Sequence, residues 1–210
     1  GSFGNMSAFS FHVTKNVNCG EGGMLCINDK ELLERAYVVR EKGTNRRKFL
    51  QGEVDKYSWI DKGSSYLTSE FQASFLFYQL ENVKLISQKR RRLWNLYHSS
   101  LKELKEDGFL ETPSLSKNRM HNSHIYSILL NNNNTLNELK LFLKSKDIDA
   151  ATHYVPLHSS KAGKKYGKSY VSIKNANIIS RRLLRLQMFH NLKEEQVRYV
   201  VKQIKLFFRK

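Results

Sequence analysis

The sequence of 210 residues predicts an α/β protein, and three observations support this class. Residues 6–12 place Phe9 and Phe11 on one face of an alternating pattern, which is typical of a strand. Residues 69–105 are predicted to form one long helical region. Residues 110–210 alternate between helical and strand-like segments, which indicates a second, α+β part.

The elements of the first hundred residues follow in a clear order. A glycine-rich loop at 20–23 separates the first strand from a second short apolar run at 24–27. Asn28 or Asp29 is predicted to cap a helix that ends at Gly43. Residues 44–66 show no clear period, and a loop of this length in a compact domain is often functional.

The C-terminal half contains two predicted strands and three predicted helices. The strands lie at 123–130 and 150–155, and the helices lie around 136–143, 175–185 and 194–208. The last helix carries a core stripe at spacings of three and four, formed by Val197, Val200, Val201, Ile204 and Phe208. We therefore expect two domains, residues 1–105 and residues 106–210.

The charge balance indicates anionic partners. Lysine and arginine number 36 against 19 aspartates and glutamates, which gives a formal net charge of +17. Nucleic acid, lipid head groups and phosphorylated small molecules all fit such a surplus. Basic clusters stand at 46–48, 89–92, 161–165 and 181–182, but the quartet at 89–92 spans a whole helical turn and cannot face one groove. No helix-turn-helix or zinc-finger pattern accompanies the clusters, so nucleic acid is not the favoured partner.

The cysteine content and the hydropathy of the sequence indicate the cellular compartment in which the protein is expected. Cys19 and Cys26 are too few to staple a fold of this size, and without a second pair we predict no metal site. A reducing cytosol is the simplest interpretation, so we expect a cytoplasmic protein. No apolar run approaches the roughly 18 residues of a membrane span, and no signal peptide precedes the first strand, so no membrane partner is expected.

Two segments carry candidate chemistry. Lys15 stands just past the first strand, where a desolvated neutral amine can attack a carbonyl, and the Ser10 hydroxyl can bind a phosphate. The alternative is that Lys15 is one of many surface lysines. His153 and His158 lie near a strand end, where they can bind a metal or a sugar diphosphate or can serve as ordinary structural histidines.

Taken together, these segments resemble the sugar aminotransferases of the DegT/DnrJ/EryC1/StrS family. The resemblance covers nearly all of the chain, and the lysine segment combined with the Gly-Ser-Ser-Tyr stretch is its specific part. It rests on the motifs at 9–16, 20–23, 27–30, 40–46, 54–57, 63–67, 153–158 and 183–186.

The resemblance implies the C-terminal part of a fold type I transferase that depends on pyridoxal 5'-phosphate. Residues 1–105 would be the remainder of the cofactor-binding large domain, with a mostly parallel sheet and a long connecting helix. Residues 106–210 would be the small C-terminal α+β domain. The implied reaction is transamination of a dTDP-linked 4-keto-6-deoxy sugar with glutamate as amino donor, for surface polysaccharide synthesis, by a homodimer.

The resemblance also implies the roles of individual residues. Lys15 matches the lysine that binds the cofactor covalently and moves a proton during catalysis. Ser10 matches the serine that contacts the cofactor phosphate, and Ser65 stands where many family members have an asparagine that the partner subunit donates to that phosphate. The segment near the sugar nucleotide supplies three substrate-binding residues: His153, Tyr154 and His158.

The family places about half of the large domain before the lysine segment, including the carboxylate that faces the pyridine nitrogen. The chain alone is therefore expected to be inactive. Two other hypotheses stay open: a non-catalytic fragment or degenerate relative, and a basic nucleic-acid-binding module.

Overall fold

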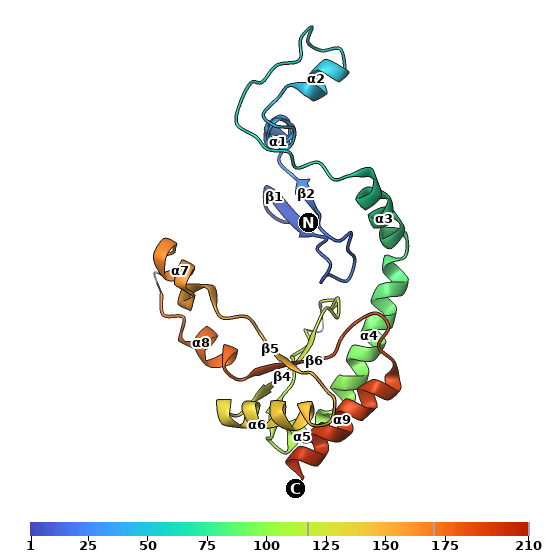
Figure 1. Cartoon of the computed structure of the whole chain (residues 1–210), viewed down its shortest axis with the longest axis vertical. Coiled ribbons are helices and arrows are strands. Elements are labelled where there is room, and N and C mark those ends of the chain that lie inside the picture. The colour runs from blue at the N-terminus through green and yellow to red at the C-terminus, as the bar shows by residue number, and fades with distance from the viewer. Residues whose placement is uncertain (117, 170, 210) are drawn as a thin grey trace. The chain divides into compact units, whose positions relative to one another are not determined.

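The computed structural model describes residues 1–116, 118–169 and 171–209, and these divide into two compact units, Gly1–Lys84 and Leu85–Lys210 (Figure 1). The predicted domain boundary at 105–106 lies later in the chain than this division. The difference arises because the long helix α4 (Val83–Ser100) buries Leu93, Trp94 and Tyr97 in the core of the second unit.

The first unit is built on a hairpin of two antiparallel strands, β1 (Met6–Ser10) and β2 (Gly23–Ile27). The structure thus confirms the strands that are predicted at 6–12 and 24–27. The hairpin is followed by η1 (Lys30–Leu32), α1 (Leu33–Arg40), α2 (Arg46–Leu50) and α3 (Glu70–Glu81). Helix α2 lies inside the stretch that the sequence analysis predicts as a loop.

Local sequence explains where these helices begin and end. The Asp29 side chain accepts a hydrogen bond from the Glu31 backbone N–H at 3.0 Å and so caps η1. Helix α1 ends before Lys42 and Gly43, which have φ of 64° and 75°. A side chain at Gly43 would meet the Asp61 carbonyl oxygen at 1.7 Å, so glycine is required there. Ser69 caps α3 with a capping box to Gln72.

Little of the first unit is buried. Helix α3 has no buried residue, although its sequence is rich in aromatic side chains. Phe71 is 90% exposed and Phe77 is 64% exposed. Strand β1 also leaves Phe9 exposed, and β1 and β2 pair only with each other among the described residues. The first unit therefore presents apolar side chains and open strand edges on its surface.

The second unit is an antiparallel sheet with helices, in the strand order β3-β4-β6-β5. Its strands are β3 (Leu110–Glu111), β4 (Tyr126–Leu130), β5 (Ala151–Thr152) and β6 (Leu183–Leu186). Its helices are α4, α5 (Lys102–Glu106), α6 (Asn133–Lys144), η2 (Leu157–Ser159), α7 (Lys161–Tyr166), α8 (Lys174–Ser180) and α9 (Glu194–Phe208).

Two predicted helices need correction. The helix expected at 175–185 ends at Ser180, and 183–186 form strand β6, because β6 pairs with both β4 and β5 and buries the alternating Leu184 and Leu186. The single helix expected at 69–105 is three helices, with the first break at Asn82. The predicted strand at 150–155 is confirmed only as the short β5.

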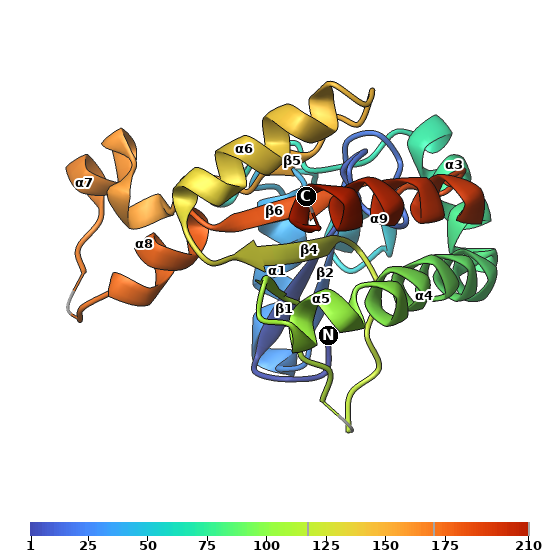
Figure 2. The same cartoon turned by 90° about the horizontal axis from the view of Figure 1, so that it is seen from below.

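One hydrophobic core holds the second unit together. It joins the buried faces of α4, α5, α6 and α9 to β4 and β6. Helices α6 and α9 lie side by side against the sheet (Figure 2). The predicted stripe on α9 is confirmed for Val197, Val200, Val201 and Ile204, all of which are buried. Fully burying such side chains stabilises the fold by about 1.5–3 kcal/mol each.

A buried arginine adds a polar contact to this core. Arg90 donates hydrogen bonds to the backbone carbonyls of Ser123 (3.1 Å), His124 (2.7 Å) and Met188 (3.0 Å). Burial lowers the pKa of the Arg90 guanidinium from its ordinary value, but an arginine stays protonated at neutral pH. Arg90 therefore ties α4 to the backbone before β4 and after β6.

Candidate active site

The β1–β2 hairpin positions the predicted lysine segment. Ser10 ends β1, and the loop 11–22 returns the chain to β2 through backbone hydrogen bonds from Phe11 to Gly22 (2.8 Å) and from Val13 to Gly20 (2.7 Å). A Cβ at Gly22 would lie 2.5 Å from the Cys19 sulfur, so the loop closes tightly at this point. The loop thus has a fixed base that carries Lys15 near its turn.

Lys15 lies exposed on this loop, and its backbone N–H donates to the His12 carbonyl at 2.9 Å. No carboxylate of the described residues pairs with its amine. Ser10 is also exposed, and its Oγ accepts a hydrogen bond from the His12 backbone N–H at 3.4 Å. The structure therefore brings Ser10 and Lys15 onto one end of the same hairpin, and both side chains face solvent.

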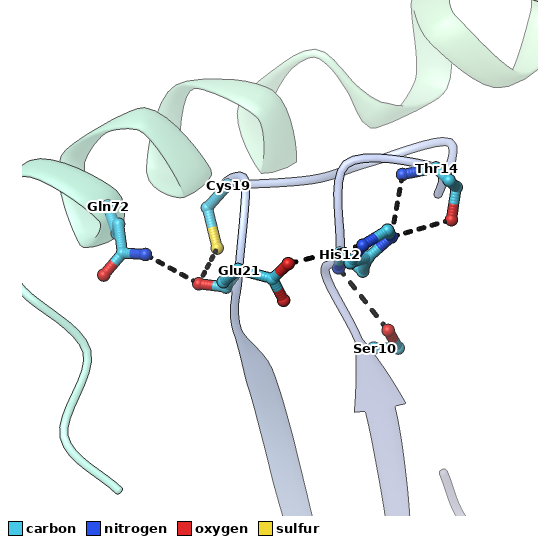
Figure 3. Close-up of polar contacts among 6 residues, drawn as sticks. All are labelled: Ser10, His12, Thr14, Cys19, Glu21 and Gln72. Atoms are coloured by element: carbon cyan, nitrogen blue, oxygen red, sulfur yellow. Dashed lines mark hydrogen bonds and ion pairs between the residues drawn. The ribbon is translucent and has the colours of Figure 1, made fainter.

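His12 fixes the loop, a role that no pattern in the sequence indicates. Its Nδ1 accepts from the Thr14 backbone N–H at 3.2 Å, which assigns the ring proton to Nε2. That nitrogen lies 3.3 Å from Glu21 Oε1 (Figure 3). From α3, Gln72 Nε2 donates to the Glu21 carbonyl at 2.8 Å, so the two sides of the loop and α3 are joined.

Ser65 lies on a different segment of the first unit. It forms an isolated antiparallel bridge with Glu41, next to a hydrogen bond from the Lys42 N–H to the Ser64 carbonyl at 3.1 Å. Ser65 is exposed, and no described contact joins it to Ser10 or Lys15. Its role at a cofactor phosphate stays a prediction.

The predicted substrate-binding residues lie in the second unit, after the short strand β5. Tyr154 is 76% exposed, and its ring packs edge-on against His153 with centroids 5.3 Å apart. His158 is partly buried in η2, and its Nε2 lies 3.0 Å from Asn177 Oδ1 of α8. His153 and Tyr154 are thus exposed neighbours, whereas His158 is anchored to another helix.

Within residues 1–116, 118–169 and 171–209, no three His, Cys, Asp or Glu side chains cluster as a metal ion would require. The same residues include no helix with the length and apolar character to cross a membrane. Cys19 and Cys26 are both free thiols.

Known proteins share both the sequence pattern and the fold. The pleiotropic regulatory protein of Geobacillus stearothermophilus is 31% identical over 211 residues, covering 100% of this chain and 53% of that protein. GDP-perosamine synthase of Escherichia coli O157:H7 is 27% identical over 209 residues, with 99% and 53% covered. The crystal structure of an aminotransferase from Brucella abortus superposes with a TM-score of 0.84 at 26% identity, covering 99% of this chain and 52% of that one.

The chain spans about half the length of the relatives that it matches. These matches confirm the family resemblance seen in the sequence. They also confirm that the chain has the C-terminal part of the fold type I transferase architecture. A family model matches residues 1–205, and the chain belongs to the DegT/DnrJ/EryC1/StrS aminotransferase family.

Proposed function

We propose that the chain carries the lysine-bearing part of a sugar-nucleotide aminotransferase active site. The observation that supports this most directly is the hairpin end that presents Ser10 and Lys15 together. The first unit would then be the remainder of the large domain, and the second unit the small C-terminal domain.

The family depends on pyridoxal phosphate, and the residues of the hairpin fit that cofactor. A hydroxyl is suited to a phosphate oxygen, and an amine without an ionic partner is suited to a carbonyl carbon. Ser10 offers the first and Lys15 the second. Lys15 would hold the cofactor covalently, and Ser10 would bind its phosphate, with Ser65 as a further phosphate ligand.

When bound, the cofactor supplies an electron sink for charge that develops at the reacting carbon. After the amino donor displaces it from the cofactor, the freed Lys15 amine would take a proton from the donor's α-carbon and deliver it to the carbon that Lys15 had held, acting as general base and then as general acid. His12 holds the loop that carries Lys15, through Thr14 and Glu21. His153, Tyr154 and His158 would bind and orient the sugar nucleotide.

The substrate is proposed to be a dTDP-linked 4-keto-6-deoxy sugar, with glutamate as amino donor. The motifs resemble those of dTDP-4-amino-4,6-dideoxygalactose transaminase, and this resemblance supports the proposed substrate. A relative that is named GDP-perosamine synthase supports the broader class of sugar nucleotides. We also propose a homodimer that works in the cytoplasm, where the free thiols of Cys19 and Cys26 stay reduced.

Covalent trapping tests the cofactor role of Lys15. The chain is incubated with pyridoxal phosphate, reduced with borohydride, and digested for peptide mass mapping. We expect the pyridoxyl group to concentrate on Lys15 and to disappear in Lys15→Ala. Lys30→Ala, which removes another exposed lysine of the same unit, is expected to leave the labelling unchanged. A label spread evenly over surface lysines would contradict the proposal.

A further inference from the structure

The amide side chain of Gln72 links helix α3 to the loop that carries Lys15. Its Nε2 donates a hydrogen bond to the backbone carbonyl of Glu21 at 2.8 Å (Figure 3). The two residues are 51 positions apart in the sequence, and both belong to the first unit. We refer to residues 19–22, which lead the chain back to β2, as the return arm of the loop. One side chain thus joins the start of α3 to the return arm.

The other end of the same amide is held by Ser69, the N-cap of α3. Gln72 Oε1 accepts hydrogen bonds from the Ser69 backbone N–H at 3.3 Å and from the Ser69 hydroxyl at 3.0 Å. A backbone N–H can only donate and a backbone carbonyl can only accept, so these partners decide which end of the amide faces which neighbour. The capping box therefore orients the NH₂ group of Gln72 toward the Glu21 carbonyl.

The return arm has little stiffness of its own. Glycines stand on both sides of Glu21, at Gly20 and at Gly22. Gly20 has a φ of 82°, a conformation that side chains other than glycine rarely adopt. Glycine gives the backbone many accessible conformations, so the sequence alone does not select the observed one. A contact from outside the loop therefore restricts this arm more than it would restrict a stiffer segment.

The return arm is paired with the arm that leads to Lys15. The Gly22 carbonyl accepts from the Phe11 N–H at 2.8 Å, and the Gly20 carbonyl accepts from the Val13 N–H at 2.7 Å. Lys15 follows Val13 by two residues. A displacement of the return arm therefore moves the backbone that carries the Lys15 amine.

The Glu21 carboxylate contributes less to this link than the Glu21 carbonyl. Its Oε1 lies 3.3 Å from His12 Nε2, but the side chains of Glu21 and His12 are 80% and 40% exposed. Exposed ion pairs stabilise little, because water screens them. The carbonyl accepts from Gln72 and also lies 3.6 Å from the sulfur of the buried Cys19. The carbonyl is therefore the point at which α3 fixes the loop.

We propose that Gln72 is a positioning residue, which fixes the loop that presents Lys15 by donating to the Glu21 carbonyl. The consequence for the reactivity of Lys15 rests on the proposed function, whereas the link between α3 and the loop does not. A loop that is already ordered loses less entropy when its amine reacts, so the amine reacts faster. Gln72 acts through another residue and takes no part in the chemistry itself.

The substitution Gln72→Glu removes this link and keeps the start of the helix. A glutamate can replace the glutamine in the capping box, because its carboxylate accepts the same hydrogen bonds from Ser69, and a negative charge is favourable in the first turn of a helix. A carboxylate cannot donate to the Glu21 carbonyl. Gln79→Glu, which adds the same charge to α3, is the matched control, and far-UV circular dichroism checks that both variants keep their helices.

Amide hydrogen exchange of the chain without cofactor is the first readout. We expect the amides of Phe11, Val13 and Lys15 to exchange about two- to tenfold faster in Gln72→Glu, because one hydrogen bond to the loop is lost. Gln79→Glu should exchange like the parent. Unchanged exchange in Gln72→Glu, or the same acceleration in Gln79→Glu, would overturn the proposal. An equal acceleration in Glu21→Ala would overturn it too, since that variant loses the carboxylate and keeps the carbonyl.

Pyridoxyl labelling followed by borohydride reduction is the second readout, with the label on Lys15 measured relative to the label on the exposed Lys30 in the same digest. We expect this ratio to fall severalfold in Gln72→Glu and to stay unchanged in Gln79→Glu. Faster exchange of the loop with an unchanged ratio would overturn the positioning role. If the parent shows no preference for Lys15, the proposed function is wrong, and hydrogen exchange then decides by itself whether Gln72 fixes the loop.

Discussion

The buried guanidinium of Arg90 allows a sharp test of what holds the second unit together. Arg90→Met keeps an apolar stem of similar length but removes every donor, so three backbone carbonyls lose their described side-chain partner. Each buried acceptor left without a donor costs about 1–3 kcal/mol, and such losses are not fully additive. We expect the free energy of unfolding to fall by about 3–5 kcal/mol.

The assay is urea unfolding followed by tryptophan fluorescence. The chain has 2 tryptophans, Trp59 and Trp94. Trp59 is 78% exposed in the first unit and Trp94 is 1% exposed in the core of the second, so a Trp59→Phe background isolates the second unit. Arg91→Met is the control, because Arg91 takes part in no ion pair among the described residues and does not belong to the hydrophobic core. A difference below about 1 kcal/mol between the two variants would refute the reasoning.

Three other predictions concern separate features. Burial lowers the pKa of His98 and of His190, so the unfolded chain takes up protons before the folded chain, and the free energy of unfolding should fall as the pH drops below about 6.5. If the melting temperature of the double variant His98→Gln/His190→Gln falls with pH as steeply as that of the parent, this prediction is wrong. Phe71→Ser combined with Phe75→Ser should reduce self-association in sedimentation, because both exposed rings lie on α3; unchanged association would show that other surfaces drive it. His12→Ala should slow pyridoxyl labelling of the hairpin lysine severalfold with the far-UV spectrum retained, because the loop loses its contacts to Thr14 and Glu21; normal labelling would remove the positioning role of His12.

The sequence allowed the elements with a strong period to be predicted. The α9 stripe of Val197, Val200, Val201 and Ile204 is visible as a spacing of three and four, and the structure buries all four residues. The sequence predicts helix where β6 lies, because the run Leu183–Leu186 is too short for its alternation to be distinguished from the pattern of the preceding α8. Its identity depends on pairing with β4 and β5, which local sequence does not contain.

The candidate site, too, can be predicted only in part from the sequence. The position of Lys15 after a strand could be predicted from the sequence. The lack of an ionic partner for its side chain, and the contacts by which His12 fixes the loop, depend on the folded hairpin. The concavity of about 920 Å³ in the second unit could not be predicted, because its lining comes from three separate segments around 131–133, 158–164 and 172–182. The sequence carried one visible signal of it, the absence of acidic residues over 150–193.

The arrangement of the second unit has a consequence for its synthesis on the ribosome. Helix α9 follows every other element of that unit in the chain, yet Val197 and Ile204 are fully buried against segments that are translated much earlier. The core side chains of α4, β4 and α6 therefore stay exposed until the ribosome has synthesised α9. Because chains fold from the N-terminus as they emerge, completion of this unit is a late event, and nascent chains that stall before residue 197 should be substrates for chaperones and proteases.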